Sequence, residues 1–429
     1  MNTSHKQKTR RPGEADPDFG KHGSVSMYEL DFPEKLQGTR LIHGLAHSDG
    51  KVIIGADLYD AKIQLNVYAL IRLNDDGSLD EKFAELGFHV GSFLDGHSCG
   101  AGKVTVLHDG KILLLGWTLS PANGWGELVV ARFHENGGID ESFGEKGRRI
   151  IPNAENSKFV VTSESIQVNS QGTLFITANY ANPDASDHYS ASIYSIKADG
   201  SWNNEFNGTG HLKFTVDTAS PFTAVNSCLL QGDKLLIAGN ALLQGLETAY
   251  VARLNPDGNP DRGFGDIRTP GLFTLRVNNL SNRFNDLSQG PDGSLACFGQ
   301  SGADWETSAK GLLSMLTPNG TPHRLFNNGE PLLTQLDSSP TGIRWRCGYT
   351  QEDGKLVALS GDQNPYLARL LPDGKPDDGF GESGYVELKE ADVDKKPLFQ
   401  LIKGSENRIL LSLNYAHLSG FGRIDAYLG

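Results

Sequence analysis

The chain has 429 residues, 51 of them glycine, with a formal net charge of −13 at pH 7 and a pI near 5.4. This acidic balance argues against binding to nucleic acid or to an anionic membrane, because both need a basic protein surface. The four cysteines form no Cys-x-x-Cys pair, so zinc-knuckle and thioredoxin-like motifs are excluded. We therefore expect no cofactor and no metal.

The first eleven residues carry four basic side chains but are followed by no apolar run, so they do not resemble a secretory signal peptide. We expect residues 1–11 to be a flexible tail. No segment approaches the roughly 18 apolar residues of a membrane helix. These features predict a soluble monomer without membrane insertion, either cytoplasmic or exported by a route that needs no signal peptide.

A Gly-x-x-(Asp, Asn or His)-x-x-Phe motif returns along the whole chain, at intervals of about 54 to 64 residues. Its phenylalanines are Phe19, Phe83, Phe143, Phe206, Phe264, Phe326 and Phe380. This spacing exceeds that of helical solenoids and is typical of four-stranded propeller blades. One unit repeated over the full length predicts one body rather than several domains.

The second unit shows the expected strands most clearly. Residues 103–107, 111–116, 128–133 and 148–151 are short runs rich in Val, Ile and Leu, and they are bounded by Gly, Asp or Asn. Four antiparallel strands are the predicted content of each unit. Related triplets of strands occupy residues 41–73, 165–196, 226–254, 286–316 and 347–370.

The last unit, with strands at 399–402, 408–413 and 423–428, ends one strand short. A strand-like segment at residues 24–30 follows a turn motif that has no blade of its own. Pairing it with residues 423–428 would complete a blade from both termini and remove exposed sheet edges. We predict an all-β fold, a seven-bladed propeller over residues 12–429 in which residues 12–31 complete the last blade.

The turn motif has a predicted mechanism. Glycines such as Gly258 supply a positive φ, the following acid (Asp261) caps a short helical turn, and the phenylalanine packs under the blade. Arginines that precede these turns could pair with the acids, although an exposed pair contributes only roughly 0–1 kcal/mol. They are Arg72, Arg132, Arg253 and Arg369. Residues 74–77 superficially resemble a calcium loop, but a Gly turn splits the acids, which favours capping over metal binding.

These units resemble the bacterial delta-sixty repeat family, which reads approximately Ala-Arg-Leu-x-x-Asp-Gly-x-x-Asp-x-x-Phe-Gly. The match is strongest at residues 252–265, 368–381 and 130–144, and weaker at 195–206 and 314–326. The resemblance implies a propeller-like repeat protein of largely unassigned function. It brings no catalytic residues with it.

Function is expected on the face that carries the connections between second and third strands, because these loops differ in length and chemistry. They lie at residues 56–66, 117–127, 180–190, 240–248, 300–310 and 414–422. Their rings would either stack on a sugar or anchor a protein, or pack between blades. The aromatic candidates are Trp117, Trp125, Tyr180 and Trp305.

Counting seven residues back from the turn of each innermost hairpin gives one hydrogen-bonding residue per blade. These residues are His43, Lys103, Ser165, Asn226, Asp286, Cys347 and Gln400. Because side chains alternate between the faces of a strand, such a ring could line the central channel. It would then be either a ligand site or the polar lining that a solvated channel needs in any propeller.

The sequence contains no nucleophile elbow, metal-binding helix or phosphate-binding loop, and no catalytic residues are predicted. His43 and Asp286 could meet across the channel, but no third partner for acid–base chemistry is evident. The leading hypothesis is a non-catalytic interaction module that binds a protein or carbohydrate through the variable loop face and the channel mouth. The alternative is a hydrolase or lyase acting on a polar small molecule at the central channel.

Overall fold

The computed structural model describes residues 10–32, 36–153, 157–161, 163–183, 185–220, 222–303, 309–336, 339, 342–361, 365–388, 400–415 and 421–429. These residues are mostly strand, with two short 3₁₀ turns, η1 (Asn327–Gly329) and η2 (Ser405–Asn407). In the described part of the chain we find no helix long and apolar enough to cross a membrane.

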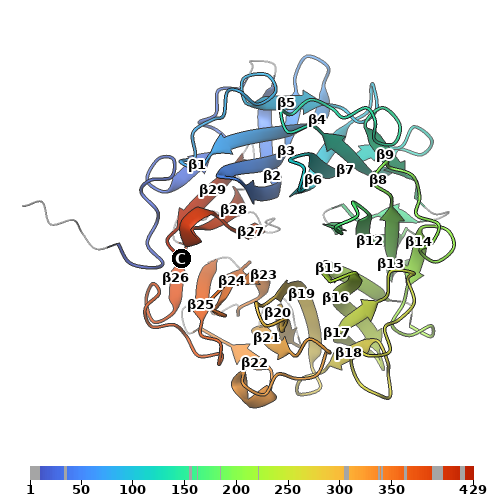
Figure 1. Cartoon of the computed structure of the whole chain (residues 1–429), viewed down its shortest axis with the longest axis vertical. Helices are drawn as coiled ribbons and strands as arrows, with labels where there is room; N and C mark the ends of the chain where they lie inside the picture. The colour runs from blue at the N-terminus through green and yellow to red at the C-terminus, as the bar shows by residue number, and fades with distance from the viewer. Residues whose placement is uncertain are drawn as a thin grey trace, which may run out of the picture.

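The strands form antiparallel sheets in chain order, which confirms the predicted all-β content and the four-stranded units (Figure 1). The first sheets are β2 (Leu36–Ser48), β3 (Lys51–Asp60), β4 (Leu65–Asn74) and β5 (Phe88–Gly91); β6 (Cys99–Val106), β7 (Ile112–Leu119), β8 (Gly126–Phe133) and β9 (Arg148–Ile151); and β11 (Ser165–Val168), β12 (Leu174–Asn182), β13 (Ala185–Ile196) and β14 (His211–Phe214), with β10 (Lys158–Phe159) also on β12.

The next sheets repeat this pattern. They are β15 (Thr223–Gln231), β16 (Lys234–Leu243), β17 (Leu246–Leu254) and β18 (Leu272–Leu275); β19 (Ser281–Gln289), β20 (Leu295–Gly302), β21 (Lys310–Leu316) and β22 (Leu332–Thr334); and β23 (Trp345–Thr350), β24 (Leu356–Ser360), β25 (Tyr366–Leu370) and β26 (Tyr385–Glu387). The C-terminal strands are β27 (Gln400–Lys403), β28 (Ile409–Tyr415) and β29 (Phe421–Tyr427). A single parallel bridge between Arg40 and Phe421 joins β29 to β2.

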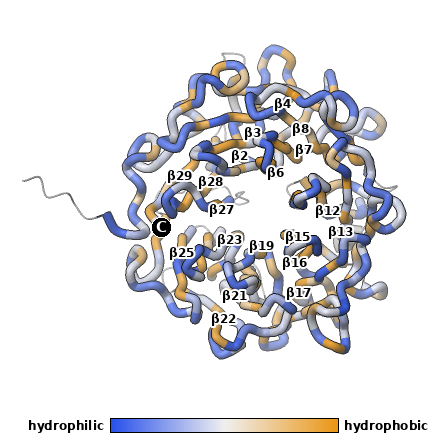
Figure 2. Tube along the Cα trace, viewed as in Figure 1, coloured by the Kyte–Doolittle hydropathy of each residue, from blue (hydrophilic) through white to orange (hydrophobic). Residues whose placement is uncertain are grey.

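The sheets succeed one another around a common axis, with the first strand of each sheet nearest to it (Figure 1). Hydrophobic residues concentrate in the strands, and the connecting turns are largely hydrophilic (Figure 2). The apolar cores lie between neighbouring sheets. In one of them Leu236 of β16 packs in the same cluster as Leu295 of β20 and Leu312 of β21. Each sheet is therefore stabilised mainly by its neighbours.

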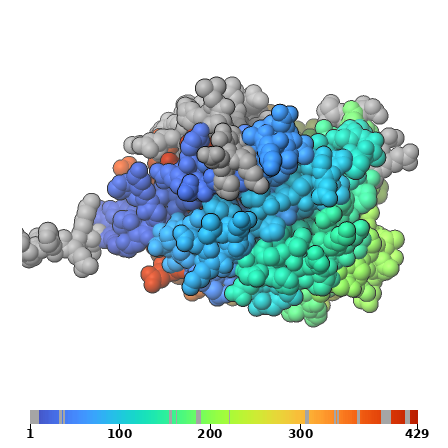
Figure 3. Space-filling view, turned by 90° about the horizontal axis from the view of Figure 1, so that it is seen from above, coloured from blue at the N-terminus to red at the C-terminus, as the bar shows by residue number. Residues whose placement is uncertain are grey.

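The two ends of the chain meet in the structure. Strand β1 (Ser24–Ser26) pairs antiparallel with β29, with Ser24 opposite Asp425. The Gly13 N–H donates to the Leu428 carbonyl, and the Leu428 N–H donates to the Glu14 carbonyl. N-terminal atoms lie beside C-terminal ones at the rim (Figure 3). This is the strand pairing predicted for the two termini, although the paired strand ends at Ser26 rather than at residue 30.

Backbone hydrogen bonds link the turn motif of each sheet to the turn of the next. In each case the N–H one residue after the motif phenylalanine donates to a carbonyl in the following Asp-Gly or Asn-Gly turn, or in its N-terminal equivalent. The pairs are Gly20 with Asp76, Ala84 with Asn136, Gly144 with Asp199, Asn207 with Asp257, Gly265 with Asn319, Asn327 with Asp373 and Gly381 with Pro12. The series thus begins at the N-terminal motif and returns to it.

The arginine, acid and phenylalanine of the motif form one compact unit. Nε of Arg253 donates to Asp261 Oδ2 at 2.7 Å, and its guanidinium lies 4.8 Å from the centre of the Phe264 ring. Oδ1 of Asp261 accepts the Gly263 N–H, which confirms the predicted cap. Corresponding units are Arg72–Asp80–Phe83, Arg132–Asp140–Phe143, Arg369–Asp377–Phe380 and Arg408–Asp16–Phe19.

These arginine–acid pairs are not the exposed pairs that the sequence suggested. Arg253 and Asp261 are only 6% and 7% exposed, and Arg253 also donates to the Pro318 carbonyl of the next sheet. Sequence distance alone does not show that the following sheet covers the pair. Removing Asp261 would leave the buried Arg253 charge without this counterion, which makes such a pair far more important than a surface one.

Acid should weaken the fold through these acids. Burial alone would raise the pKa of Asp261, but hydrogen bonds from Lys234, Gly263 and Arg253 lower it to about 2. The stabilisation from Asp261 is therefore complete above the unfolded pKa, roughly 4, and is lost as the pH falls towards 2. We expect the free energy of unfolding, measured with urea, to fall steeply between pH 4 and 2.

The variant Asp261→Asn separates this effect from general acid destabilisation. It should be less stable than the parent at pH 6 and should lose less stability on acidification. The matched control is Asp233→Asn, because Asp233 is exposed in the two-residue turn between β15 and β16. Equal pH dependence in all three proteins would contradict this role of Asp261.

Candidate functional site

The connections between second and third strands are shorter than the sequence suggested. β3 continues to Asp60 and β16 continues to Leu243, so only residues 61–64 and 244–245 connect those hairpins. Asp57 and Asn240, which look like loop residues, lie inside these strands. Polar side chains there do not end the strand because each finds a hydrogen-bonding partner.

Several of these in-strand polar residues clamp adjacent sheets together. Asn414 of β28 accepts the Ile42 N–H at 2.9 Å and donates to the Ile42 carbonyl at 2.8 Å. Asn179 of β12 makes the same pair of bonds to Val225. Oδ1 of Asp57 accepts the Ala101 N–H at 2.6 Å. The clamps fix the inner ends of the sheets relative to one another.

The innermost strands carry β-bulges next to these clamps. They lie between Ile42 and Gly44, Ala101 and Val104, Val225 and Ser227, Phe284 and Asp286, and Trp345 and Cys347. Bulges redirect side chains and are frequent beside binding sites. Here they place His43, Asn226, Asn285 and Arg346 at corresponding positions.

The predicted polar ring therefore mixes two registers. Lys103, Ser165, Asp286, Cys347 and Gln400 correspond to one another, but His43 and Asn226 are displaced by one residue. The cause is turn length. In β2–β3 and β15–β16 the closing pairs, Ser48 with Lys51 and Gln231 with Lys234, leave two-residue turns. The β6–β7 turn has three residues, since the Leu107 N–H donates to the Lys111 carbonyl.

Most members of the predicted ring are engaged within the protein. Asn226 donates to Asn240 Oδ1 and to the Phe284 carbonyl, at 3.2 and 2.7 Å. The Gln400 amide donates to the His43 carbonyl, and Ser165 Oγ accepts from the Cys228 thiol at 3.4 Å. These side chains hold adjacent sheets together.

Asp286 is the most heavily engaged member. Its Oδ1 accepts Ser227 Oγ–H at 2.8 Å and the Leu287 N–H at 2.9 Å, and its Oδ2 accepts the Gly348 N–H at 3.1 Å. Burial raises the pKa of Asp286 in spite of these donors. Its carboxylate joins β19 to the neighbouring sheets on both sides, so the role of Asp286 is structural.

A different group of side chains gathers where the first three sheets meet the axis. We call His43, Asp57, Lys103, Trp117 and Glu164 the axial cluster. Nε2 of His43 lies 3.2 Å from Asp57 Oδ2. Glu164 is 5% exposed, and its Oε1 occupies the space where Gly102 would carry a side chain. Likewise Asp57 and the Trp117 indole nitrogen fill the space beside Gly100.

The axial cluster contains both cationic and anionic side chains. Burial lowers the pKa of His43, but the carboxylates of Asp57 and Glu164 outweigh it, so the pKa is raised overall. Lys103 acts in the opposite direction on His43. Burial also raises the pKa values of Asp286 and Cys347, and the Lys103 ammonium opposes both shifts. Lys103 thus acts on groups from three other sheets, which places its charge towards the axis.

The predicted loop aromatics lie in different environments. Tyr180 is 3% exposed, and its hydroxyl accepts a hydrogen bond from Tyr194 at 2.9 Å, so it is a core residue of β12 rather than a binding ring. Trp117 lies on β7 and is half-buried, whereas Trp125 is half-buried in the connection between β7 and β8. Trp305 lies outside the described residues. Among the candidates that lie in the described residues, Trp125 is the one found in a connection between strands.

Sequence reasoning missed Asp57 and Glu164. Asp57 had a detectable signal, because it follows a small residue in the second strand just as Asn240 follows Gly239 and Gln300 follows Gly299. No sequence pattern indicated Glu164, because its carboxylate occupies the space beside Gly102, which belongs to another sheet.

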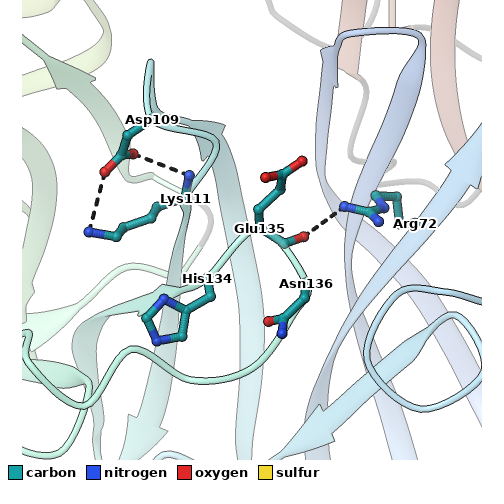
Figure 4. Close-up of a pocket in the computed structure, with 6 residues that line it drawn as sticks. All are labelled: Arg72, Asp109, Lys111, His134, Glu135 and Asn136. Carbon is teal, nitrogen blue, oxygen red and sulfur yellow. Dashed lines mark hydrogen bonds and ion pairs between the residues drawn. The ribbon is translucent and has the colours of Figure 1, made fainter.

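The opposite, turn-bearing face also has a cavity, of about 400 Å³ (Figure 4). It is lined by Arg72, Asp109, Lys111, His134, Glu135 and Asn136. Arg72 donates to the Glu135 carbonyl at 2.7 Å, and Lys111 lies 3.3 Å from Asp109. Because Arg72 also belongs to an arginine–acid–phenylalanine unit, this cavity is part of the repeat's own framework.

The described residues contain no group of three or more His, Cys, Asp or Glu side chains arranged to hold a metal ion. All four cysteines are buried and form no disulfide. Burial raises the pKa of the Cys228 thiol to about 11, which keeps it protonated and unreactive at neutral pH.

Comparison with known families gives a match to the domain of unknown function (DUF5122) beta-propeller, at residues 47–83, 108–143, 231–264 and 351–380. These matches support a β-propeller repeat family. A search of curated proteins gives no match.

Solved structures with similar folds include the polysaccharide lyase Uly1, with a TM-score of 0.54 and 10% identity over 93% of this chain and 94% of that one. The β-propeller domain of the Trilobed protease from Pyrococcus furiosus has a TM-score of 0.47 and 9% identity, over 92% and 94% of the two chains. YCF48 bound to D1 peptide has a TM-score of 0.45 and 11% identity, over 98% and 99%. At such identities the likeness to the lyase shows the fold alone.

Proposed function

We propose that this protein is a monomeric, seven-bladed β-propeller of the delta-sixty repeat type, acting as a non-catalytic interaction module. Its ligand is a protein or a carbohydrate, bound by the loop face and the channel mouth. The series of turn-to-turn hydrogen bonds supports the closed ring, because its last member joins Gly381 to Pro12. The Arg408–Asp16 pair supports completion of the last blade by residues 12–31.

The contrast between the two faces is the observation that carries the functional proposal. The turn face repeats the same Asp-Gly turns and buried ion pairs. The other face varies, with connections at residues 61–64, 120–125 and 244–245 that differ in length and composition. Ile63, at the tip of one connection, is 52% exposed. Variable loops on a rigid, repeated scaffold are where binding sites are usually built.

Binding can be tested with the full chain on a glycan array and with a displayed random-peptide library. A ligand found there should bind about tenfold more weakly to the double variant Ile63→Ser, Trp125→Ser, because exposed apolar and aromatic side chains contribute most to recognition. The matched control is Ile267→Ser, since Ile267 is 92% exposed beside a turn-face motif. Equal losses in both variants, or no ligand from either source, would contradict the proposal.

The alternative function is a hydrolase or lyase that acts on a polar small molecule at the axis. The His43–Asp57 pair, with the charge of Glu164 acting on it, favours this function, because a histidine paired with a carboxylate can transfer protons. Mass spectrometry of the bound ligand distinguishes the two functions. Products that form with the parent protein and not with His43→Gln would favour the enzyme.

A further inference from the structure

Two carboxylates near the axis, those of Asp57 and Asp286, are already engaged by the protein. Oδ1 of Asp57 accepts the Ala101 N–H, and its Oδ2 lies 3.2 Å from Nε2 of His43. Asp286 accepts three hydrogen bonds from protein donors. These carboxylates therefore have little remaining capacity to bind a cation or the hydroxyls of a ligand.

The donors of the axial cluster, in contrast, lack hydrogen-bond acceptors among the described residues. The half-buried Lys103 ammonium makes no hydrogen bond or ion pair with another described residue. His43 is only 8% exposed, and its Nδ1 is buried without a hydrogen-bond partner among the described residues. Within the same part of the chain, the indole nitrogen of Trp117 also lacks a partner. A buried donor without an acceptor is unfavourable, so a ligand that supplies an acceptor is favoured there.

This imbalance defines the ligand that would complete the site. An incoming group must supply acceptor oxygens for the Lys103 ammonium and the His43 ring, and negative charge to match the ammonium. It must also tolerate the nearby carboxylates of Asp57, Glu164 and Asp286. A monoanion with two oxygens meets both conditions better than a phosphate dianion, because repulsion grows with the charge of the ligand.

We propose that the axial cluster binds the carboxylate group of a ligand, with Lys103 and His43 as its donors. The inference rests on the proposed binding function of the channel mouth and names the chemical class of the ligand. That carboxylate belongs either to a uronic acid unit of a carbohydrate or to a small organic acid, and the recognition chemistry is shared.

The test uses isothermal titration calorimetry on the full chain with glucuronate, glucose and succinate at constant ionic strength. Glucuronate and glucose differ by one carboxylate, so the parent protein should bind glucuronate at least about tenfold more tightly. Lys103→Met should lose most of that preference, and Lys103→Arg should retain part of it. The matched control is Lys375→Met, because the Lys375 side chain is 77% exposed and pairs with Asp373 on the surface.

The source of the carboxylate follows from which probes bind. Glucuronate alone would indicate a carbohydrate ligand, and succinate with or without glucuronate a small organic acid; both outcomes support the inference. Equal binding of glucose and glucuronate, or no binding of either carboxylate, would overturn it. The parent protein alone answers this point, even if Lys103→Met fails to fold. A neutral glycan or peptide bound independently of Lys103 would overturn the carboxylate site and leave the interaction module intact.

Discussion

Deletion of residues 12–30 is expected to lower the melting temperature by on the order of 10 °C. The deletion removes Phe19, which is fully buried, and Asp16, which pairs with Arg408 at 2.6 Å. Arg408 then keeps Asp75, whose side chain is 41% exposed, but loses its buried counterion Asp16, which is destabilising. The loss of β1 also exposes the edge of β29 to solvent and to aggregation.

Scanning calorimetry measures this effect, and adding the missing segment separately is the decisive control. A synthetic peptide of residues 10–32 should restore much of the melting temperature, because its contacts with β29 and Arg408 need no covalent link. Truncation of residues 1–9, within the predicted tail, should leave the transition where it is. An unchanged melting curve after deletion of residues 12–30 would refute closure by the N-terminal segment.

The strand order and the motif geometry could be predicted because they depend on local sequence. Gly77 and Gly258 have φ values of 82° and 87°, as an Asp-Gly turn requires, and Asp261 caps the next turn through an N–H two residues away. The meeting of the termini followed from counting strands. What the local pattern did not reveal was burial of the ion pairs, since the neighbouring sheet that covers Arg253 is distant in sequence.

The candidate site could be predicted only in part, because it depends on contacts between sheets. Lys103 and His43 were identified, but counting back from a glycine assumes equal turns, and the two-residue turn after Ser48 displaced His43 by one position. Glu164 occupies the space left by Gly102, and no local pattern in either strand indicates that contact. The geometry of the site therefore depends on β-bulges and on how one sheet packs against the next.

Phe264→Ala is expected to lower the free energy of unfolding by about 3–5 kcal/mol. The Phe264 ring is 1% exposed and lies between the Arg253 guanidinium, 4.8 Å away, and the turn of the next sheet. Gly320 of that turn has a φ of 77°, and a side chain there would come within 2.6 Å of the ring. The turn therefore fits closely against Phe264 and cannot easily collapse into the cavity that alanine would leave.

Urea unfolding at pH 7 measures this loss, with Ile267→Ala as the control three residues away. Ile267 is 92% exposed, so its truncation should change the free energy of unfolding by less than about 0.5 kcal/mol. A cost below about 1 kcal/mol for Phe264→Ala would mean that the ring does not anchor the turn. A full cost, with lost protection of the amides near Gly320 against hydrogen exchange, would show that the motif phenylalanine joins one sheet to the next.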